Sequence, residues 1–308
     1  MMQALVVSGA NNFFDAELSS GALVRASLKG KKLNDEDGKF YNPLSPGDIV
    51  LIEQDKINDG EGQITERLPR KNFFARLNEK RNLPQVLAAN IDFLLIVDAL
   101  KNPPFHPRFI DRVLMQAEYN ALHAVIVLNK CDLKLSQKEN EERERYAQIY
   151  KNAGYPVIEV SAQTGAGFAE LENIIAHNVA AFVGRSGVGK SSIINRLCPD
   201  GIEQKTGLVS HKYDRGIHTT TQGVLLHAKN GGTLIDTPGV RRFENYGIAP
   251  EDCALYFREM KDFVGKCSFG ISCTHTHENG CAILEAVTSG SISAERYDSM
   301  ARLLEHSS

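Results

Sequence analysis

Two kinds of hydrophobic pattern divide the chain near residue 88. Before that point, short β-prone runs are separated by turns rich in Gly, Pro, Asn and Asp. The runs cover residues 4–8, 23–28, 48–54 and 61–68, and no long amphipathic helix interrupts them. This spacing predicts a small Greek-key barrel of the OB type, although an SH3-like barrel would give a similar pattern.

After residue 88, continuous apolar runs alternate with helical patterns. The apolar runs lie at 92–97, 124–128, 157–160, 179–183 and 233–235, and the clearest helical patterns lie at 108–119 and 136–153. Continuous apolar strands that alternate with helices indicate a parallel sheet covered on both faces. We therefore expect a doubly wound α/β domain that ends near residue 245. Short helical stretches follow it.

These changes of pattern predict three domains, which fits a length of 308 residues. The boundaries we expect are 1–83 for an OB-like barrel, 84–245 for the α/β domain and 246–308 for a small helical domain. No apolar run approaches the ~18 residues of a membrane span, and the N-terminus lacks a signal pattern. We therefore expect a cytoplasmic monomer without membrane association.

The formal net charge of −3 gives no general support for nucleic-acid binding. Local basic clusters are the alternative. Lys29, Lys31 and Lys32 form one cluster, and six basic residues between Arg67 and Arg81 form another. A solvated connector would show the same charges.

A phosphate-binding loop follows the apolar run 179–183. Residues 184–191 read GRSGVGKS, which matches GxxxxGK[ST], and a helical pattern comes next. The glycines allow backbone N–H groups to curl around a phosphate, and the helix N-terminus adds its dipole. Lys190 would reach the β- and γ-phosphates, and Ser191 would bind magnesium.

Two further segments complete a switch-like pattern. Asp236 follows an apolar strand and begins the sequence DTPG, which places a carboxylate near the magnesium shell and Gly239 near the γ-phosphate. Between the two motifs, Thr220 is our choice for closing over magnesium, with Thr219 and Thr221 as alternatives. Val240 stands where many GTPases have a water-orienting Gln, so His218 is the nearest catalytic candidate, unless it is a solvated loop histidine.

Two motifs fit guanine recognition. Residues 129–132 read NKCD at the end of an apolar strand, and Asp132 can accept hydrogen bonds from N1–H and the N2 amine of guanine. Ser161-Ala162 follows the next strand, where a backbone N–H can meet guanine O6. The expected nucleotide-binding residues are Asn129, Lys130, Cys131, Asp132, Ser161, Ala162, Gly184, Arg185, Ser186, Gly187, Val188, Gly189, Lys190, Ser191, Ser192, Asp236 and Gly239.

The order of these motifs is informative. The base-reading motifs come before the phosphate loop, whereas in Ras-like GTPases they come after it. Because domain termini often lie close together, a moved chain break can leave the site intact. The pattern therefore predicts a circularly permuted P-loop GTPase domain that uses GTP, GDP and magnesium.

Three of the six cysteines cluster near the C-terminus. Cys267, Cys273, His275 and Cys281 have the spacing Cys-x5-Cys-x-His-x5-Cys, which suits a closed tetrahedral Cys₃His zinc site. His277 is the alternative nitrogen ligand. We expect one structural zinc ion, because a small lobe with few apolar residues needs such a cross-link.

Together these motifs resemble the RsgA/YjeQ family of circularly permuted bacterial GTPases. The resemblance covers the whole chain and rests on GRSGVGKSS, on GIHTTT at 216–221 and on the Cys-x-His cluster. It implies binding to the 30S ribosomal subunit and its 16S rRNA, ribosome-stimulated GTP hydrolysis in late small-subunit maturation, and His218 as the catalytic histidine. Two other functions remain open at this point. One is a binding module that uses GTP only to set its conformation, and the other is a metal-dependent nucleic-acid enzyme.

Overall fold

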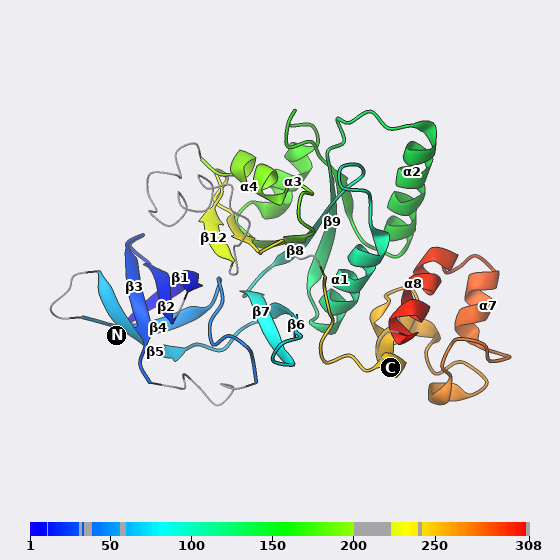
Figure 1. The fold of residues 1–308 in the computed structure, drawn as a ribbon, viewed down its shortest axis with the longest axis horizontal. Helices are drawn as coiled ribbons and strands as arrows, with labels where there is room; N and C mark the ends of the chain where they lie inside the picture. Colours follow the sequence, from blue (N-terminus) through cyan, green and yellow to red (C-terminus); the bar gives the residue numbers. More distant parts are fainter. Residues whose placement is uncertain are drawn as a thin grey trace.

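The computed structural model describes residues 1–10, 12–30, 33, 39–55, 60–199, 223–239 and 242–305. His218 and Thr220, the two expected catalytic residues, lie outside these ranges. The described chain forms a β-barrel, a central sheet with helices on both faces and a group of short C-terminal helices, arranged side by side (Figure 1). In this part of the chain, no helix is both long and apolar enough to span a membrane.

The N-terminal barrel has five strands in the closed order β1-β2-β3-β5-β4. They are β1 (Met2–Ala10), β2 (Phe13–Leu18), β3 (Leu23–Leu28), β4 (Ile49–Gln54) and β5 (Glu61–Arg67). β1 pairs with β4 to close the barrel, and β3 runs parallel to β5. Alternate residues such as Val24 and Ala26 point into the core. The predicted OB-like barrel is confirmed.

The β-prone runs at 4–8 and 23–28 leave Phe13 and Phe14 on a connecting loop. This expectation is wrong, because both residues lie on β2. The period of two explains their different environments, since Phe14 is 6% exposed in the barrel core and Phe13 is 49% exposed on its surface.

A two-stranded hairpin, β6 (Phe73–Asn78) and β7 (Leu83–Ala89), connects the barrel to the central sheet. Phe74 and Leu87 of this hairpin belong to the same hydrophobic core as the central sheet. The boundary at residues 83 and 84 remains a prediction, and so does the boundary at 245 and 246.

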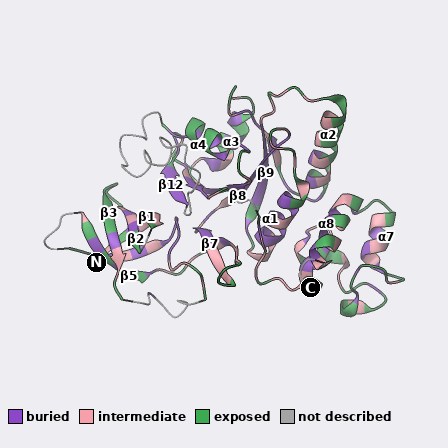
Figure 2. Cartoon of the chain, in the orientation of Figure 1, coloured by how far each residue is buried: buried purple, intermediate pink, exposed green. Residues whose placement is uncertain are grey.

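The central sheet has six strands in the order β10-β9-β8-β11-β13-β12. β8 (Phe93–Ala99), β9 (His123–Asn129), β10 (Val157–Glu159), β11 (Val179–Gly184) and β13 (Thr233–Asp236) are parallel, and β12 (Val224–His227) is an antiparallel edge strand. The interior strands are almost wholly buried (Figure 2). Burial on both faces requires the continuous apolar runs seen in the sequence, and the predicted doubly wound α/β fold is confirmed.

Four helices cover the sheet. α1 (Pro107–Tyr119) and α2 (Gln137–Asn152) lie on one side, and α3 (Phe168–Ile175) and α4 (Lys190–Leu197) on the other (Figure 1). A capping box fixes the start of α2, because Ser136 Oγ accepts from Glu139 N–H and the Glu139 carboxylate accepts from Ser136 N–H. The outward side of α2 is largely exposed (Figure 2).

The C-terminal part consists of η1 (Pro250–Tyr256), η2 (Lys261–Phe263), η3 (Gly270–Ser272), α7 (Ala282–Thr288) and α8 (Ala294–Glu305). It has its own core, which includes Phe257, Met260 and Met300, and this core also takes in Met115 of α1. The segment that leads into it, residues 242–246, is held against β6. Leu77 N–H of β6 donates to Glu244 O at 2.9 Å, and Phe243 stacks on Phe74.

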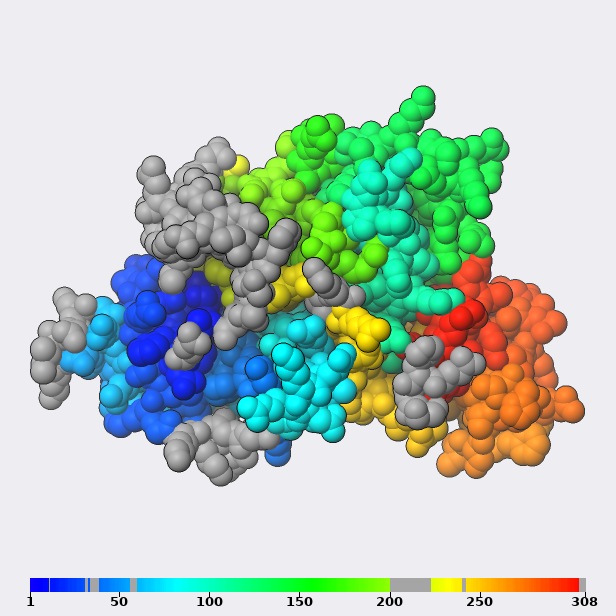
Figure 3. Space-filling view, in the orientation of Figure 1, coloured from blue at the N-terminus to red at the C-terminus, as the bar shows by residue number. Residues whose placement is uncertain are grey.

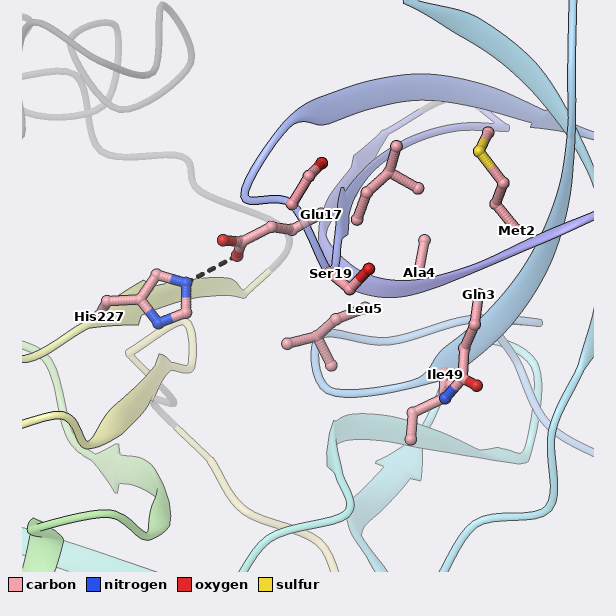
Figure 4. Close-up of a pocket in the computed structure, with 10 residues that line it drawn as sticks. Met2, Gln3, Ala4, Leu5, Glu17, Ser19, Ile49 and His227 are labelled. Atoms are coloured by element: carbon pink, nitrogen blue, oxygen red, sulfur yellow. Dashed lines mark hydrogen bonds and ion pairs between the residues drawn. The ribbon is translucent and has the colours of Figure 1, made fainter.

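The barrel also contacts the edge strand of the sheet. The Glu17 carboxylate of β2 and His227 Nε2 of β12 are hydrogen-bonded at 2.6 Å beside a cavity of about 900 Å³ (Figure 4). Before β4, Gly47 adopts φ +91°, and a Cβ there would lie 2.1 Å from Ala89 O of β7. Only glycine tolerates this close approach, so the barrel packs tightly against the end of the hairpin.

Candidate functional site

The motif residues gather at the carboxyl edge of the central sheet. β8 and β11 are neighbours there, although the chain passes through β9 and β10 between them. In open α/β sheets such a reversal of strand order opens a crevice, and ligands bind at it. The phosphate loop follows β11 and the NKCD motif follows β9, so both motifs border this crevice.

Two glycines give the phosphate loop its shape. Gly189 is the N-cap of α4 with φ +95°, and a Cβ there would lie 2.2 Å from Asn129 Nδ2. Gly184 ends β11, where a Cβ would lie 2.3 Å from Val97 O of the neighbouring strand. Val188 is fully buried and anchors the loop, whereas Ser186 and Gly187 are exposed. The loop therefore presents backbone rather than side chains to a ligand.

Lys190 lies within this loop. Its side chain is largely buried, and Nζ donates to Gly184 O at 2.8 Å and to Arg185 O at 3.2 Å. Ser191 and Ser192, in the first turn of α4, are exposed to solvent. The end of the DTPG segment comes close to the same group, since a Cβ on Gly239 would be 3.4 Å from Lys190 Nζ.

Asp236 and Thr237 hold the DTPG segment against β11. Asp236 is 4% exposed at the end of β13, and Thr237 Oγ1 donates to Phe182 O at 2.6 Å. Asp236 therefore lies opposite Phe182 of β11, two residues before the phosphate loop begins.

Asn129 connects the base-reading and phosphate-binding loops. It is 1% exposed, its Nδ2 donates to Val188 O at 2.9 Å, and its Oδ1 accepts from Ala162 N–H at 3.1 Å. One buried amide therefore joins three loops that lie 33 and 59 residues apart in sequence. Both polar ends of the amide are satisfied, which makes the link rigid.

The remaining base-reading residues surround this link. Ser161 Oγ donates to the exposed carboxylate of Asp132 at 2.5 Å and accepts from Thr164 N–H at 3.1 Å, which orients that carboxylate. Lys130 adopts φ +66° and its Nζ donates to Gly187 O at 2.8 Å and to Asn102 O. Cys131 N–H donates to Val160 O at 3.1 Å and ties the motif to the strand end.

The sequence analysis did not identify Asp98, which forms an ion pair with Arg185 of the phosphate loop. It is fully buried at the end of β8 and accepts from Ala99 N–H and His106 N–H. Burial raises the pKa of this carboxyl group, and the Arg185 guanidinium, at 3.1 Å, opposes the rise. Arg185 also donates to Pro104 O at 2.5 Å, so its side chain points toward the loop after β8. An acidic residue at the end of an apolar run was the signal available in the sequence.

A second cluster lies in the C-terminal part. Cys267, Cys273, His275 and Cys281 are all buried, and their ligand atoms lie within 4.8 Å of one another. His275 Nδ1 is 3.5 Å from Cys267 Sγ and 3.4 Å from Cys281 Sγ, and the two sulfurs are 3.8 Å apart. His277 is exposed and is not part of this cluster.

These distances fit a tetrahedral zinc site. With Zn–S near 2.3 Å and Zn–N near 2.0–2.1 Å, tetrahedral geometry requires roughly 3.8 Å between sulfurs and roughly 3.6 Å between sulfur and nitrogen. Tyr297 OH donates to His275 O at 2.8 Å and Ala282 N–H donates to Cys267 Sγ at 3.3 Å, so contacts outside the cluster fix the ligands. The donor set is compatible with one zinc ion.

The sheet, the two base-reading loops and the later phosphate loop define a P-loop GTPase with circularly permuted motif order. A family profile described as RsgA GTPase matches residues 67–246. The chain belongs to the RsgA GTPase family, and it is a GTPase.

Known proteins match along almost the whole chain. The small ribosomal subunit biogenesis GTPase RsgA of Borreliella burgdorferi is 38% identical over 304 residues, which is 97% of this chain and 94% of the relative. The protein of that name from Actinobacillus pleuropneumoniae is 37% identical and covers 99% of this chain and 85% of its own length. The crystal structure of YjeQ from Thermotoga maritima aligns with a TM-score of 0.76 at 30% identity, covering 99% and 98% of the two chains. YloQ, described as a circularly permuted GTPase, aligns with a TM-score of 0.71 at 25% identity, covering 100% and 95%.

Proposed function

We propose that this chain acts in the cytoplasm as a monomer that binds the 30S ribosomal subunit through its 16S rRNA and hydrolyses GTP there during late small-subunit maturation. Family membership supplies the GTPase activity. The partner is supported by relatives at 37–38% identity that carry the name small ribosomal subunit biogenesis GTPase. A metal-dependent nucleic-acid enzyme is a poorer proposal, because a closed set of three thiolates and one imidazole leaves no open position for a substrate.

The buried link through Asn129 carries the nucleotide part of the proposal. It holds the phosphate loop and the loop before Ala162 at a fixed separation, although the chain order is permuted. A guanine nucleotide must touch both loops at once, with its base at one and its phosphates at the other. Fixed separation of two binding elements lowers the ordering cost of binding.

Each motif residue has a defined task in this proposal. Asp132, held by Ser161, reads N1–H and the N2 amine of guanine, and the Lys130 stem covers the base. The bond between Ala162 N–H and Asn129 gives way, or is shared, when guanine O6 approaches that N–H. Lys190 Nζ leaves the carbonyl oxygens of Gly184 and Arg185 for the β- and γ-phosphates.

Ser191 and Asp236 are the residues that would hold magnesium, Ser191 through its hydroxyl and Asp236 through water. When bound, magnesium neutralises charge on the β- and γ-phosphates. We propose Thr220 as a further magnesium ligand and His218 as the group that orients the attacking water. The second task falls to His218 because Val240 has no side chain able to orient a water molecule.

Zinc, held by the cysteine and histidine cluster, would cross-link the C-terminal part. We propose that this part and the barrel contact the ribosome while the GTPase domain changes state. On the barrel, Phe13 is a candidate for stacking on an unpaired base, because its ring is half exposed and Arg25 lies over it at 5.4 Å.

GTP hydrolysis by the purified protein, alone and with purified 30S or 50S subunits, tests the proposal. We expect strong stimulation by 30S and little by 50S. His218→Ala should remove the stimulated rate while leaving nucleotide affinity unchanged, and His211→Ala, which removes another histidine from the stretch between the two motifs, is the matched control. Nucleotide binding without any stimulation by 30S would refute the proposed partner and favour a nucleotide-gated binding module.

A further inference from the structure

A groove of about 810 Å³ lies where α1, the phosphate loop, the segment after β13 and α8 meet. Five arginines line it: Arg108 and Arg112 of α1, Arg185 of the phosphate loop, Arg242, and Arg302 of α8. In its described lining, the acidic residues are Glu79 and Glu244. Figure 3 shows the segment after β13, in yellow, between the β6–β7 hairpin in cyan and α8 in red.

Carboxylates neutralise part of this charge. Arg108 and Arg302 share one carboxylate, that of Asp298, at 3.3 and 2.9 Å. Arg112 pairs with Glu244 at 3.0 Å, and Arg185 pairs with Asp98, which is buried and out of reach of a ligand. Five arginines therefore face four carboxylates when Asp98 and Asp298 are counted with Glu79 and Glu244. The groove is cationic in a chain whose formal net charge is −3.

The basic residues near the barrel that were candidates for RNA contact are less available for phosphate binding than the groove arginines. Lys29 is paired with Glu53 at 2.6 Å. Arg67 is buried, and the Arg70 side chain is 4% exposed in an ion pair with Asp48. Lys31 and Lys32 lie outside the described residues. Around Arg25, the outward positions of β2 and β5 carry Asp15, Glu17 and Glu61. Lys29, Arg67 and Arg70 are therefore paired or buried, whereas the groove brings five arginines together.

We propose that this groove binds the phosphodiester backbone of a single-stranded RNA segment. The proposal rests on the proposed function, in which the partner is the RNA-rich small subunit. Arginine suits the role because its planar guanidinium binds phosphate through two parallel N–H groups. Arg108 and Arg112 are one helical turn apart, about 6 Å along α1, so they face successive positions of a chain rather than a single anion.

The position of the groove connects RNA binding to the nucleotide state. Arg242 is three residues after Gly239, whose backbone lies beside Lys190. Glu244, which neutralises Arg112, belongs to the same segment. A change in the DTPG segment on nucleotide exchange would therefore move Arg242. It would also move Glu244 and so free Arg112 to bind phosphate. RNA in the groove would in turn favour one nucleotide state, because such coupling is reciprocal.

The test compares the full-length protein with the double variant Arg242→Gln, Arg302→Gln. Both side chains are well exposed and neither holds the nucleotide. The matched control is Lys138→Gln, Lys151→Gln, which removes the same charge from exposed positions on α2, outside the groove. The probe is a fluorescent oligouridylate of about 12 nucleotides, titrated by anisotropy over about 50–200 mM salt.

We expect the groove variant to lose roughly two- to thirty-fold in affinity, as two exposed ion pairs would contribute. The slope of log K against log salt should become shallower by about 1.4, since each phosphate contact on a single strand contributes about 0.7. The control should match the wild type in both quantities. An unchanged slope in the groove variant, an equal loss in the control, or no binding of the oligonucleotide by the wild type overturns the proposal.

A parallel measurement separates this inference from the proposed function. If 30S subunits fail to stimulate GTP hydrolysis by the wild type, the proposed function fails whatever the oligonucleotide result. If the groove variant loses 30S stimulation but binds the oligonucleotide like the wild type, the groove binds an acidic protein segment and the RNA proposal is wrong.

Discussion

Arg296 is the central residue of the interface between the C-terminal part and the GTPase domain. Its side chain is 3% exposed and pairs with Asp111 of α1 at 2.6 Å and with Glu259 at 2.5 Å. Tyr150 OH of α2 donates to the same Asp111 carboxylate, and the guanidinium lies 4.4 Å from the Phe257 ring centroid. The nearby carboxylates raise the pKa of Arg296 above its already high value, so the residue stays charged.

Arg296→Met tests how much this cluster contributes to stability. The variant keeps most of the side-chain volume but leaves two carboxylates without their counter-charge. Removal of one partner from a buried ion pair costs about 3–5 kcal/mol. At about 2–4 °C per kcal/mol for a domain of 150–250 residues, the unfolding transition should fall by roughly 6–20 °C.

Thermal unfolding followed by circular dichroism measures this change, with Arg145→Met as the control. Arg145 crosses the same interface to Glu295, but its side chain is 55% exposed, and such pairs contribute about 1 kcal/mol or less. A loss of less than about 1 kcal/mol in the free energy of unfolding at neutral pH would refute the reasoning, and so would a loss equal to that of Arg145→Met.

Three further changes test the two sites. Asp132→Asn places an amide donor where a carboxylate acceptor reads guanine, so GTP turnover should fall by about 10⁴-fold. Xanthosine triphosphate, which offers a carbonyl acceptor at C2, should become the better substrate. Steady-state competition between the two nucleotides measures the preference, and a retained preference for GTP would exclude base recognition by Asp132. Cys281→Ser should reduce bound zinc and lower the unfolding temperature, whereas His277→Ala, at an exposed position, should change neither. Metal analysis measures the bound zinc and calorimetry measures the unfolding temperature. Zinc loss from His277→Ala would mean that the ligand set is wrong. Gly189→Ala places a Cβ 2.2 Å from Asn129 Nδ2 at φ +95°, so nucleotide affinity should drop roughly tenfold or more. Titration with fluorescent GDP checks this, and unchanged affinity would mean the loop rearranges at little cost.

The parts of the fold that were predicted have local causes. Buried parallel strands need continuous apolar runs, so the runs at 92–97, 124–128 and 179–183 located β8, β9 and β11. Motif spacing placed the loops at one sheet edge because the ends of parallel strands meet there. By contrast, the sequence analysis did not identify β12, an antiparallel edge strand of four residues.

The parts that were missed depend on contacts between distant segments. Asp98 and Arg185 are 87 residues apart, and Arg296 and Asp111 are 185 apart. No spacing rule connects such pairs, because only the fold brings the two partners together. The basic cluster that begins at Arg67 was expected to be a surface patch. Arg67 and the Arg70 side chain are buried instead, and the sequence pattern does not indicate this burial.

The link through Asn129 also has a consequence for synthesis of the chain. Its partners, Ala162 and Val188, both emerge after it, and the phosphate loop follows the whole base-reading half. A growing chain that stops before residue 184 therefore contains the base-reading motifs but lacks the phosphate loop. If these loops bind GTP as proposed, we expect affinity for nucleotide only when more than half of the polypeptide has been made, so that truncated products do not compete with the finished protein for GTP.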